Sequence, residues 1–434
     1  MYLVLPAIFF ILCPLVSGHG SESSGYVQVR EDAHMFWWLM RARSGSDEYQ
    51  QYPLLMWLEG GPGSSSTGFS NFAMIGPLTQ DLVPRNNSWL NYTNLLFVDS
   101  PVGADYSYDT HDNAFAGINA QIVTDLVTLM KSFLIQFPEF QKTPISIFGE
   151  SYGGKVAVTF ARELDAAIKT KGINCSIHAV GLGDPAIAPL VTATYFSSYL
   201  HVMSLIDQVQ KDEIDKLVSN MRIAMEGKRQ SAEATFLWIA VREMIEEFTF
   251  GVNWNNVMQP SEPYAHLKKK MRTNSDTMNL TIYQNNEYSG SSQQLDKLMN
   301  GVVKQKLHIP DHVTWGSQKR KVFDHLVADF MYPVVNDVEL LLNHTSIKVA
   351  VYTGQLDLVG NTLGTEAWIN GMHWDKADEF KRIRRKVFAG SVGHVKAFVK
   401  EPDNLSVFWI MDAGHLVPAD QLDVSVLMLQ KILT

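Results

Sequence analysis

The sequence predicts an α/β fold with a mostly parallel central sheet, and two observations carry this prediction. Short runs rich in β-branched and aromatic residues alternate with longer segments whose apolar residues recur at helical spacing, as in residues 116–137. Several of the short runs are apolar at nearly every position, which is typical of strands that helices cover on both faces.

Composition limits the class of protein. The chain has 434 residues, 46% of them hydrophobic, which is enough for a large core. Its net charge of −9 argues against sequence-independent binding of nucleic acid, which needs a basic surface. Of the two cysteines, Cys13 falls in an expected leader, so Cys175 should stand alone in the mature chain as a buried, inert thiol.

Residues 1–18 are expected to be a secretory signal peptide, because an almost wholly apolar run is followed by small residues suited to cleavage. No second long apolar run occurs, so we expect no membrane association after cleavage and a secreted or lysosomal location. Acceptor sequons for N-glycosylation agree with this route. They begin at Asn86, Asn91, Asn174, Asn279, Asn343 and Asn404.

The amino-terminal part of the predicted core begins with a hairpin and continues with alternating strands and helices. The expected elements are a hairpin within residues 25–43, strands at 52–58, 94–99 and 176–182, and a helix at 116–137. The strand at 52–58 runs into a Gly-Gly-Pro-Gly segment at residues 60–63, where glycines let the backbone approach a ligand closely.

Residues 145–163 have the pattern of a nucleophile elbow, which is a strand, a sharp turn and a helix. The strand ends in Gly149-x-Ser151-x-Gly153. A serine at this turn needs a positive φ angle that pushes its Oγ out of the sheet, and a side chain at either glycine would collide with it. The pattern therefore predicts an α/β-hydrolase fold with Ser151 as the nucleophile.

The character of the chain changes between residues 191 and 315. Amphipathic helices are expected at 212–225 and 236–250, followed by a polar stretch with few strand signals. We predict that residues 191–315 form an inserted helical cap and that residues 19–190 and 316–434 form the hydrolase core. The remaining core elements are expected to be a helix at 322–342, strands at 347–352 and 405–411, and a helix at 424–433.

Three reactive side chains each follow a predicted strand. Ser151, Asp357 and His415 appear in that order, which is the order of the α/β-hydrolases. A serine hydroxyl needs a base, neutral imidazole can take its proton, and a carboxylate fixes the imidazole tautomer and stabilises its charged form. We therefore predict that these residues form a catalytic triad.

The sequence gives little support for a metal or a dinucleotide. It has no His-Glu-x-x-His motif and no cysteine pair in the expected mature chain, so we expect no metal and no cofactor. Residues 181–186 begin with Gly-x-Gly, but Pro185 interrupts the helix that a dinucleotide site requires. We interpret these residues as a loop.

Five separated blocks resemble the serine carboxypeptidases (peptidase S10), and within them the retinoid-inducible branch. The blocks are Trp57-x-x-Gly60-Gly61-Pro62-Gly63, Pro101-Val102-Gly103 with Tyr106-Ser107-Tyr108, Gly149-Glu150-Ser151-Tyr152-Gly153-Gly154, Gly354-Gln355-Leu356-Asp357 and Gly414-His415-x-Val417-Pro418-x-Asp420-Gln421. The resemblance spans nearly the whole mature chain. It implies removal of C-terminal residues from peptides in an acidic secretory or lysosomal compartment. It also implies an oxyanion hole formed by the backbone N–H groups of Gly61 and Tyr152.

The chain departs from the family pattern where the family holds the terminal carboxylate of its substrate. Glu59 stands at a position that is usually Asn, and Met74 at one that is usually Glu, while Glu150 is retained. Two nearby carboxyl groups cannot both ionise cheaply, so the resemblance leads us to expect that Glu59 and Glu150 share a proton at acidic pH. With Trp57 and Gly60 beside them, they would bind the substrate carboxylate.

The sequence therefore predicts a serine carboxypeptidase that acts on peptides. Two alternatives stay open because of Glu59. One is a binding or protective protein that keeps the fold without catalysis, and the other is an esterase or acyltransferase. The sequence also leaves the oligomeric state open, a homodimer included.

Overall fold

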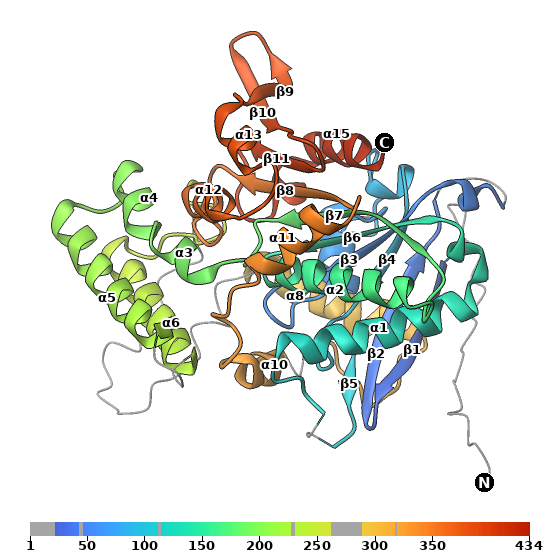
Figure 1. Cartoon of the computed structure of the whole chain (residues 1–434). Helices are drawn as coiled ribbons and strands as arrows, with labels where there is room; N and C mark the ends of the chain where they lie inside the picture. Colours follow the sequence, from blue (N-terminus) through green and yellow to red (C-terminus); the bar gives the residue numbers. More distant parts are fainter. Residues whose placement is uncertain (1–21, 43–46, 112–113, 227–230, 262–288, 317–318) are drawn as a thin grey trace.

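The computed structural model describes the chain apart from residues 1–21, 43–46, 112–113, 227–230, 262–288 and 317–318. The expected signal peptide and the Asn279 sequon therefore lie outside the described residues. In the part that is described, the strands form one 11-stranded sheet. Helices pack on both of its faces, as the α/β prediction requires (Figure 1).

The middle of the sheet is parallel. In spatial order its strands are β4 (Asn94–Val98), β3 (Leu54–Leu58), β6 (Pro144–Glu150), β7 (Ser176–Gly183), β8 (Lys348–Gly354) and β11 (Leu405–Ile410). Residues 54–58 and 94–98 are buried at every position, which accounts for their unbroken apolar sequence. Because the strands are parallel, their carboxyl ends lie at one edge of the sheet, where ligands bind in folds of this class.

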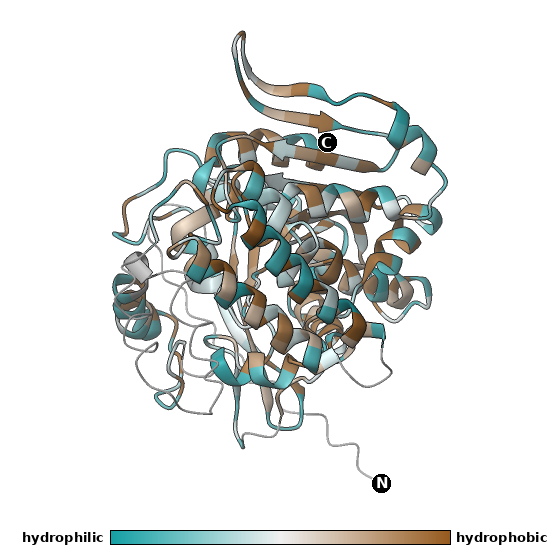
Figure 2. Cartoon of the chain, turned by 90° about the vertical axis from the view of Figure 1, so that its left-hand side faces the viewer, coloured by the Kyte–Doolittle hydropathy of each residue, from teal (hydrophilic) through white to brown (hydrophobic). Residues whose placement is uncertain are grey.

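Antiparallel strands flank this parallel region. β1 (Glu22–Arg30) and β2 (Ala33–Met40) form the predicted hairpin, and β2 also pairs with the short β5 (Tyr108–Asp109). At the other edge, β9 (Lys386–Ser391) and β10 (His394–Lys400) form a hairpin that projects from the body of the molecule (Figure 1, Figure 2). The sequence analysis assigned no strands here, because β9 is largely exposed and lacks a buried apolar face.

Two apolar clusters fill the spaces between the sheet and the helices. On one face lie α1 (Asn119–Gln136), α2 (Tyr152–Lys169), α11 (Val335–His344) and α12 (Thr362–Gly371). On the other face lie the π-helical segment Ser66–Ile75, α8 (Ser289–Leu298) and the terminal α15 (Leu422–Leu433). The amphipathic pattern of residues 116–137 corresponds to α1, whose Ile122, Leu126 and Leu129 are buried.

Two local predictions were wrong. The helix expected at residues 322–342 is divided into α10 (Lys319–Leu326) and α11, because Pro333 lacks the N–H group that a continuous helix needs. The loop interpretation of residues 181–186 is wrong for residues 181–183, which belong to β7; residues 181 and 182 fall within the strand expected at 176–182. A Cβ on Gly181 would lie 2.2 Å from Cδ1 of Phe148, so this glycine provides space for a neighbouring ring.

The region after β7 is helical, with α3 (Pro189–Ala193), α4 (Phe196–Val202), α5 (Gln208–Glu226), α6 (Ser231–Phe248), α8 and α9 (Lys304–Lys306). α5 and α6 pack together to one side of the sheet (Figure 1). Leu295, Met299 and Val303 instead belong to the apolar cluster on the second face of the sheet. The boundaries of the cap at residues 191 and 315 stay a prediction.

Cys175 is buried, as expected, and burial raises the pKa of its thiol to about 11. The thiol therefore stays protonated and unreactive at physiological pH. Among the helices that the structure describes, none has the length and apolar character needed to cross a membrane.

Candidate active site

The nucleophile elbow has the predicted geometry. β6 ends at Glu150, α2 begins at Tyr152, and Ser151 between them has φ 59° and ψ −124°. The N–H group of Ser151 donates to the carbonyl oxygen of Gly183 at 2.8 Å, which anchors the turn to the neighbouring strand. A Cβ on Gly149 would lie 2.2 Å from the carbonyl oxygen of Gly153, so the turn has no room for a larger residue there.

The other two predicted triad residues are joined directly. Nδ1 of His415 lies 2.8 Å from Oδ2 of Asp357, and both side chains are buried. The backbone N–H group of Gly360 also donates to Oδ2 of Asp357, at 2.9 Å. The N–H group of His415 donates to the carbonyl oxygen of Asn255 at 2.6 Å. These contacts fix the carboxylate and the imidazole at the ends of β8 and β11.

The predicted oxyanion-hole residues lie beside the nucleophile. Gly61, Ser151 and Tyr152 line one pocket. Gly61 has φ +106°, a conformation that favours glycine, and a Cβ on Gly60 would lie 2.7 Å from Cβ of Ser151. The Gly-Gly-Pro-Gly segment therefore packs against the elbow, and the N–H group of Tyr152 lies at the positive end of α2.

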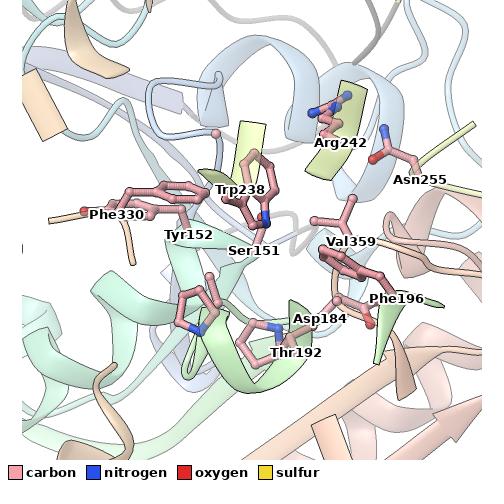
Figure 3. A pocket seen from close by; sticks show the side chains of 15 residues that line it. Ser151, Tyr152, Asp184, Thr192, Phe196, Trp238, Arg242, Asn255, Phe330 and Val359 are labelled. Carbon is pink, nitrogen blue, oxygen red and sulfur yellow. The ribbon is translucent and has the colours of Figure 1, made fainter. Parts of the chain in front are cut away.

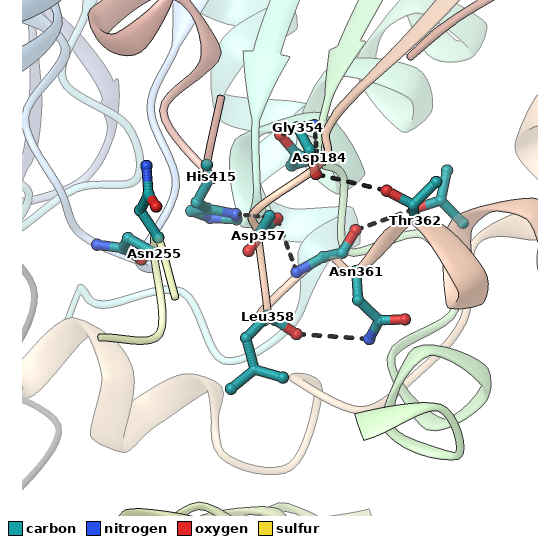
Figure 4. A network of polar contacts seen from close by, with 12 residues as sticks. Asp184, Asn255, Gly354, Asp357, Leu358, Asn361, Thr362 and His415 are labelled. Carbon is teal, nitrogen blue, oxygen red and sulfur yellow. Dashed lines mark hydrogen bonds and ion pairs between the residues drawn. The ribbon is translucent and has the colours of Figure 1, made fainter. Parts of the chain in front are cut away.

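Asp184 is a site residue that the sequence analysis missed. Its two carboxylate oxygens accept from the N–H group of Gly354, at 3.1 and 3.2 Å (Figure 4), and one of them lies within 4.8 Å of a carboxylate oxygen of Asp357. Burial, followed by the charge of Asp357, raises the pKa of Asp184 well above its usual range. Its position directly after a buried strand, like that of the triad residues, was the signal that could have identified it.

Among the described residues, Asp184, Asp357 and His415 form a cluster that could hold a metal ion, since one ligand atom from each lies within 4.8 Å of the others. In the structure these groups bond to one another and to the backbone. Burial and the charge of Asp357 raise the pKa of Asp184, so ionising both neighbouring carboxyl groups together is costly. The arrangement is therefore that of a triad with a third carboxyl group behind it.

Glu59 lies in a polar niche beside the elbow. Its Oε1 accepts from the N–H group of Gly60 at 3.0 Å, and its Oε2 accepts from Nε1 of Trp57 at 3.2 Å and from Oγ of Ser70. Burial raises the pKa of Glu59, and these hydrogen bonds oppose the rise. The structure thus brings the predicted group of Trp57, Glu59 and Gly60 together.

Glu150 has a different environment. Both of its carboxylate oxygens are buried without a hydrogen-bond partner among the described residues. Burial, and then the nearby charge of Glu59, raises the pKa of Glu150 well above its usual range. The coupling of Glu59 and Glu150 is therefore electrostatic. Met74, which replaces the usual second glutamate, is fully buried in the apolar cluster behind them.

The pocket in front of Ser151 is mostly apolar. Figure 3 shows Phe196, Trp238, Phe330 and Val359 around it, contributed by several helices and loops. Arg242 also lines the pocket, and its Nε lies 3.1 Å from Oε1 of Glu246 on the same helix. These wall residues are not among those predicted from the sequence. For Trp238 and Arg242, the helical pattern of α6 shows which face is apolar but not which part of the core that face meets.

Comparison with known proteins agrees with this site. The sequence profile described as "Serine carboxypeptidase" matches residues 15–434. The retinoid-inducible serine carboxypeptidase of Rattus norvegicus is 39% identical over 416 residues, which cover 95% of this chain and 91% of that protein. Serine carboxypeptidase-like 51 of Arabidopsis thaliana is 34% identical over 432 residues, covering 96% and 93%.

A solved structure shows the same fold. Kex1(delta)p, a prohormone-processing carboxypeptidase from Saccharomyces cerevisiae, superposes with a TM-score of 0.79 at 19% identity, over 95% of this chain and 91% of that one. The fold, the profile match over nearly the whole chain and the two relatives agree with the geometry of the elbow and the triad. The chain belongs to the serine carboxypeptidase family.

Proposed function

We propose that this serine-type carboxypeptidase removes the C-terminal residue of peptides through an acyl-enzyme formed on Ser151. One observation carries the proposal: the elbow serine and the hydrogen-bonded pair of Asp357 and His415 stand at the same edge of the sheet. The pocket that contains Ser151 also contains Gly61 and Tyr152, so nucleophile and oxyanion donors face one cavity. This is the equipment that acyl transfer requires.

In the proposed reaction, His415 takes the proton of Ser151 Oγ as this oxygen attacks the carbonyl carbon of the last peptide bond. The N–H groups of Gly61 and Tyr152 stabilise the negative oxygen of the tetrahedral intermediate. The C–N bond then breaks, and the proton on His415 passes to the departing amine. A water molecule next gives a proton to His415 and attacks the ester, which releases the shortened peptide and restores Ser151.

The terminal carboxylate of the substrate needs a hydrogen-bond donor rather than another negative charge. The pKa of Glu150 is raised well above its usual range by burial and by Glu59. We infer that Glu150 is protonated and donates to this carboxylate, while Glu59, Trp57 and Gly60 complete its surroundings. The unpartnered carboxylate oxygens of Glu150 support this role, since a buried polar group normally has a partner.

The pocket also indicates which side chain the enzyme prefers on the substrate residue whose carbonyl is attacked. Its aromatic wall suits a large apolar side chain, because such a group gains most from leaving water. Phe196, Trp238 and Phe330 provide that wall. We expect a phenylalanine at this substrate position to be cleaved more efficiently than an alanine.

The function is tested by hydrolysis of a blocked dipeptide with a free carboxyl end, and of its amide, between pH 4 and 8. We expect the free acid to be preferred at pH 5 and the preference to fade as rising pH ionises the Glu59–Glu150 pair. Glu150→Gln keeps a neutral donor at every pH, so it should flatten this dependence. Glu366→Gln, which alters a carboxylate bonded to Trp409 outside the site, is the matched control.

Two results would favour the alternatives. Equal turnover of the acid and the amide at pH 5 would indicate a general hydrolase or esterase and remove the proposed role of Glu150. No turnover of either, together with no labelling of Ser151 by a fluorophosphonate, would indicate a binding protein that keeps the fold.

We propose a secretory or lysosomal location for the enzyme, in keeping with its sequons. Asn86 and Asn174 are exposed, and Nδ2 of Asn174 donates to Oε1 of Gln141 at 3.1 Å. Asn404 is half-buried and its Nδ2 donates to backbone carbonyl oxygens, among them that of Ile347 at 3.3 Å, so we expect it to be less accessible to modification than Asn86. Mass spectrometry of tryptic glycopeptides tests the assignment. A homodimer stays a prediction.

A further inference from the structure

A buried lysine joins the elbow helix to the segment between α10 and α11. Nζ of Lys155 lies 2.7 Å from the carbonyl oxygen and 3.1 Å from the carboxylate Oδ2 of Asp329. The Lys155 side chain is only 1% exposed. Taking an ammonium group out of water is costly, and this pair takes no part in bond breaking. Its contacts therefore indicate another role.

The same carboxylate holds a side chain of the active site. The hydroxyl of Tyr152 donates to Oδ2 of Asp329 at 3.1 Å. Nζ of Lys155 lies 5.1 Å from the centre of the Tyr152 ring, in the range of a cation–π contact. Asp329 and Lys155 thus hold Tyr152 by its hydroxyl and by one face of its ring, at the residue that follows the nucleophile.

Phe330 completes a wall beside Tyr152. The two rings are parallel within 1°, with centroids 6.1 Å apart, and the Phe330 ring also lies 5.1 Å from that of Trp238. All three rings line the pocket that contains Ser151 (Figure 3). Nζ of Lys155 reaches the carbonyl oxygen of Phe330 at 3.5 Å. The lysine therefore contacts the backbone of one ring residue and the face of the other.

Other contacts hold this segment at its ends. Oγ1 of Thr235 on α6 donates to the carbonyl oxygen of Val327 at 2.7 Å. The N–H group of Val334 donates to the carbonyl oxygen of Ile187 at 2.8 Å. Between these two anchors, the pair formed with Lys155 holds the middle of the segment, which is the part that carries Phe330.

We propose that Lys155 and Asp329 are positioning residues that set which substrate side chains the pocket accepts. Neither group touches the reacting atoms, and both act through the rings of Tyr152 and Phe330. Without the ion pair, the rings of Tyr152 and Phe330 can shift away from the substrate. A large aromatic side chain of the substrate then loses more van der Waals contacts than a methyl group does. This inference rests on the proposed function, because it takes the pocket to bind the side chain of the residue whose carbonyl is attacked.

The test compares blocked dipeptides with phenylalanine or alanine at the residue whose carbonyl is attacked. Asp329→Asn should lower the ratio of their kcat/KM values about tenfold, chiefly through the KM of the phenylalanine substrate. The double variant Lys155→Met with Asp329→Leu removes both charges, so it avoids an unpaired buried ion. Its melting temperature should recover toward that of the wild type, while the ratio stays low.

Asp125→Asn is the matched control, because Asp125 is a buried aspartate paired with Arg30 at 2.7 Å and does not line the pocket. It should lower the melting temperature and leave the phenylalanine-to-alanine ratio unchanged. A ratio that is also unchanged in Asp329→Asn and in the double variant would overturn the proposal, since the pair would then stabilise the fold without shaping the pocket.

Failure of the proposed function can be told apart from failure of this inference. A wild-type protein that cleaves neither dipeptide contradicts the proposed peptidase activity. The pair is then tested by the rates at which fluorophosphonates with a benzyl or a methyl group label Ser151. A lower benzyl-to-methyl ratio in both variants supports the positioning role, and an unchanged ratio overturns it.

Discussion

Nδ1 of His415 lies 2.8 Å from Oδ2 of Asp357, although 58 residues separate them in the chain. The contact arises because β8 and β11 are parallel neighbours, so the loops that leave their carboxyl ends lie side by side. Asp184 leaves the next strand, β7, and reaches the same carboxylate. The sheet order thus brings three side chains together that the chain keeps far apart.

Replacing Asp357 by Asn should lower kcat by about 10⁴-fold, because an amide no longer fixes the tautomer of His415 or stabilises its charged form. Ser151→Ala should cost at least about as much. Steady-state hydrolysis of a blocked dipeptide measures both. Asp412→Asn is the control: Asp412 is exposed after β11, and Asn tolerates its φ of 57°. Full activity in Asp357→Asn would remove Asp357 from the mechanism.

Asp184→Asn should keep activity within about tenfold of the wild type, whereas Asp184→Gly should lose about 10²-fold. The raised pKa of Asp184 means that the group carries a proton toward Asp357, and an amide can donate in the same way. Both replacements tolerate its φ of 38°. Values of kcat for the two variants check this, and equal losses in both would show that an ionised carboxylate is needed.

Asp105→Asn should make the protein more stable than the wild type, and this difference in the free energy of unfolding should grow as pH rises from about 4 to 8. Burial, and then the charge of Asp99, raises the pKa of Asp105 well above its usual range, and the pKa of Asp99 is itself raised to about 6. Above the ordinary aspartate pKa, the folded state therefore holds a proton that the unfolded state has released, so the free energy of unfolding falls as pH rises.

Asparagine does not titrate, and it accepts the φ of 48° at position 105. Its advantage over the wild type should be small near pH 4 and reach about 1 kcal/mol or more at pH 8. Denaturant unfolding at several pH values measures it. A constant difference across this range would show that Asp105 does not titrate differently in the folded and unfolded states.

Gly153→Ala should destabilise the protein by about 3 kcal/mol, since a Cβ there would lie 2.2 Å from the carbonyl oxygen of Leu58. Backbone atoms cannot move aside as a flexible side chain can. Gly371→Ala is the matched control, because nothing lies within 4 Å of its added Cβ, and alanine favours the helix. Thermal unfolding distinguishes the two. Similar melting temperatures for both variants would mean that the elbow tolerates a side chain.

The parallel core, the elbow and the predicted triad could all be recognised in the sequence. Buried parallel strands must be apolar along their length, and the turn at Ser151 tolerates only glycine at Gly149 and Gly153. These are local requirements, so they leave local patterns. The order Ser151, Asp357, His415 could be recognised because each residue lies a short way beyond the carboxyl end of a strand.

The residues that surround the triad could be identified only in the tertiary structure. Asp184, the wall formed by Trp238 and Phe330, and the pair of Lys155 and Asp329 all depend on contacts between distant segments. An amphipathic helix such as α6 shows which of its faces is buried, but its partner is set by how loops of different lengths return the chain to the sheet. The division of the helix expected at residues 322–342 has a different origin, because its cause, Pro333, is local and stands in the sequence.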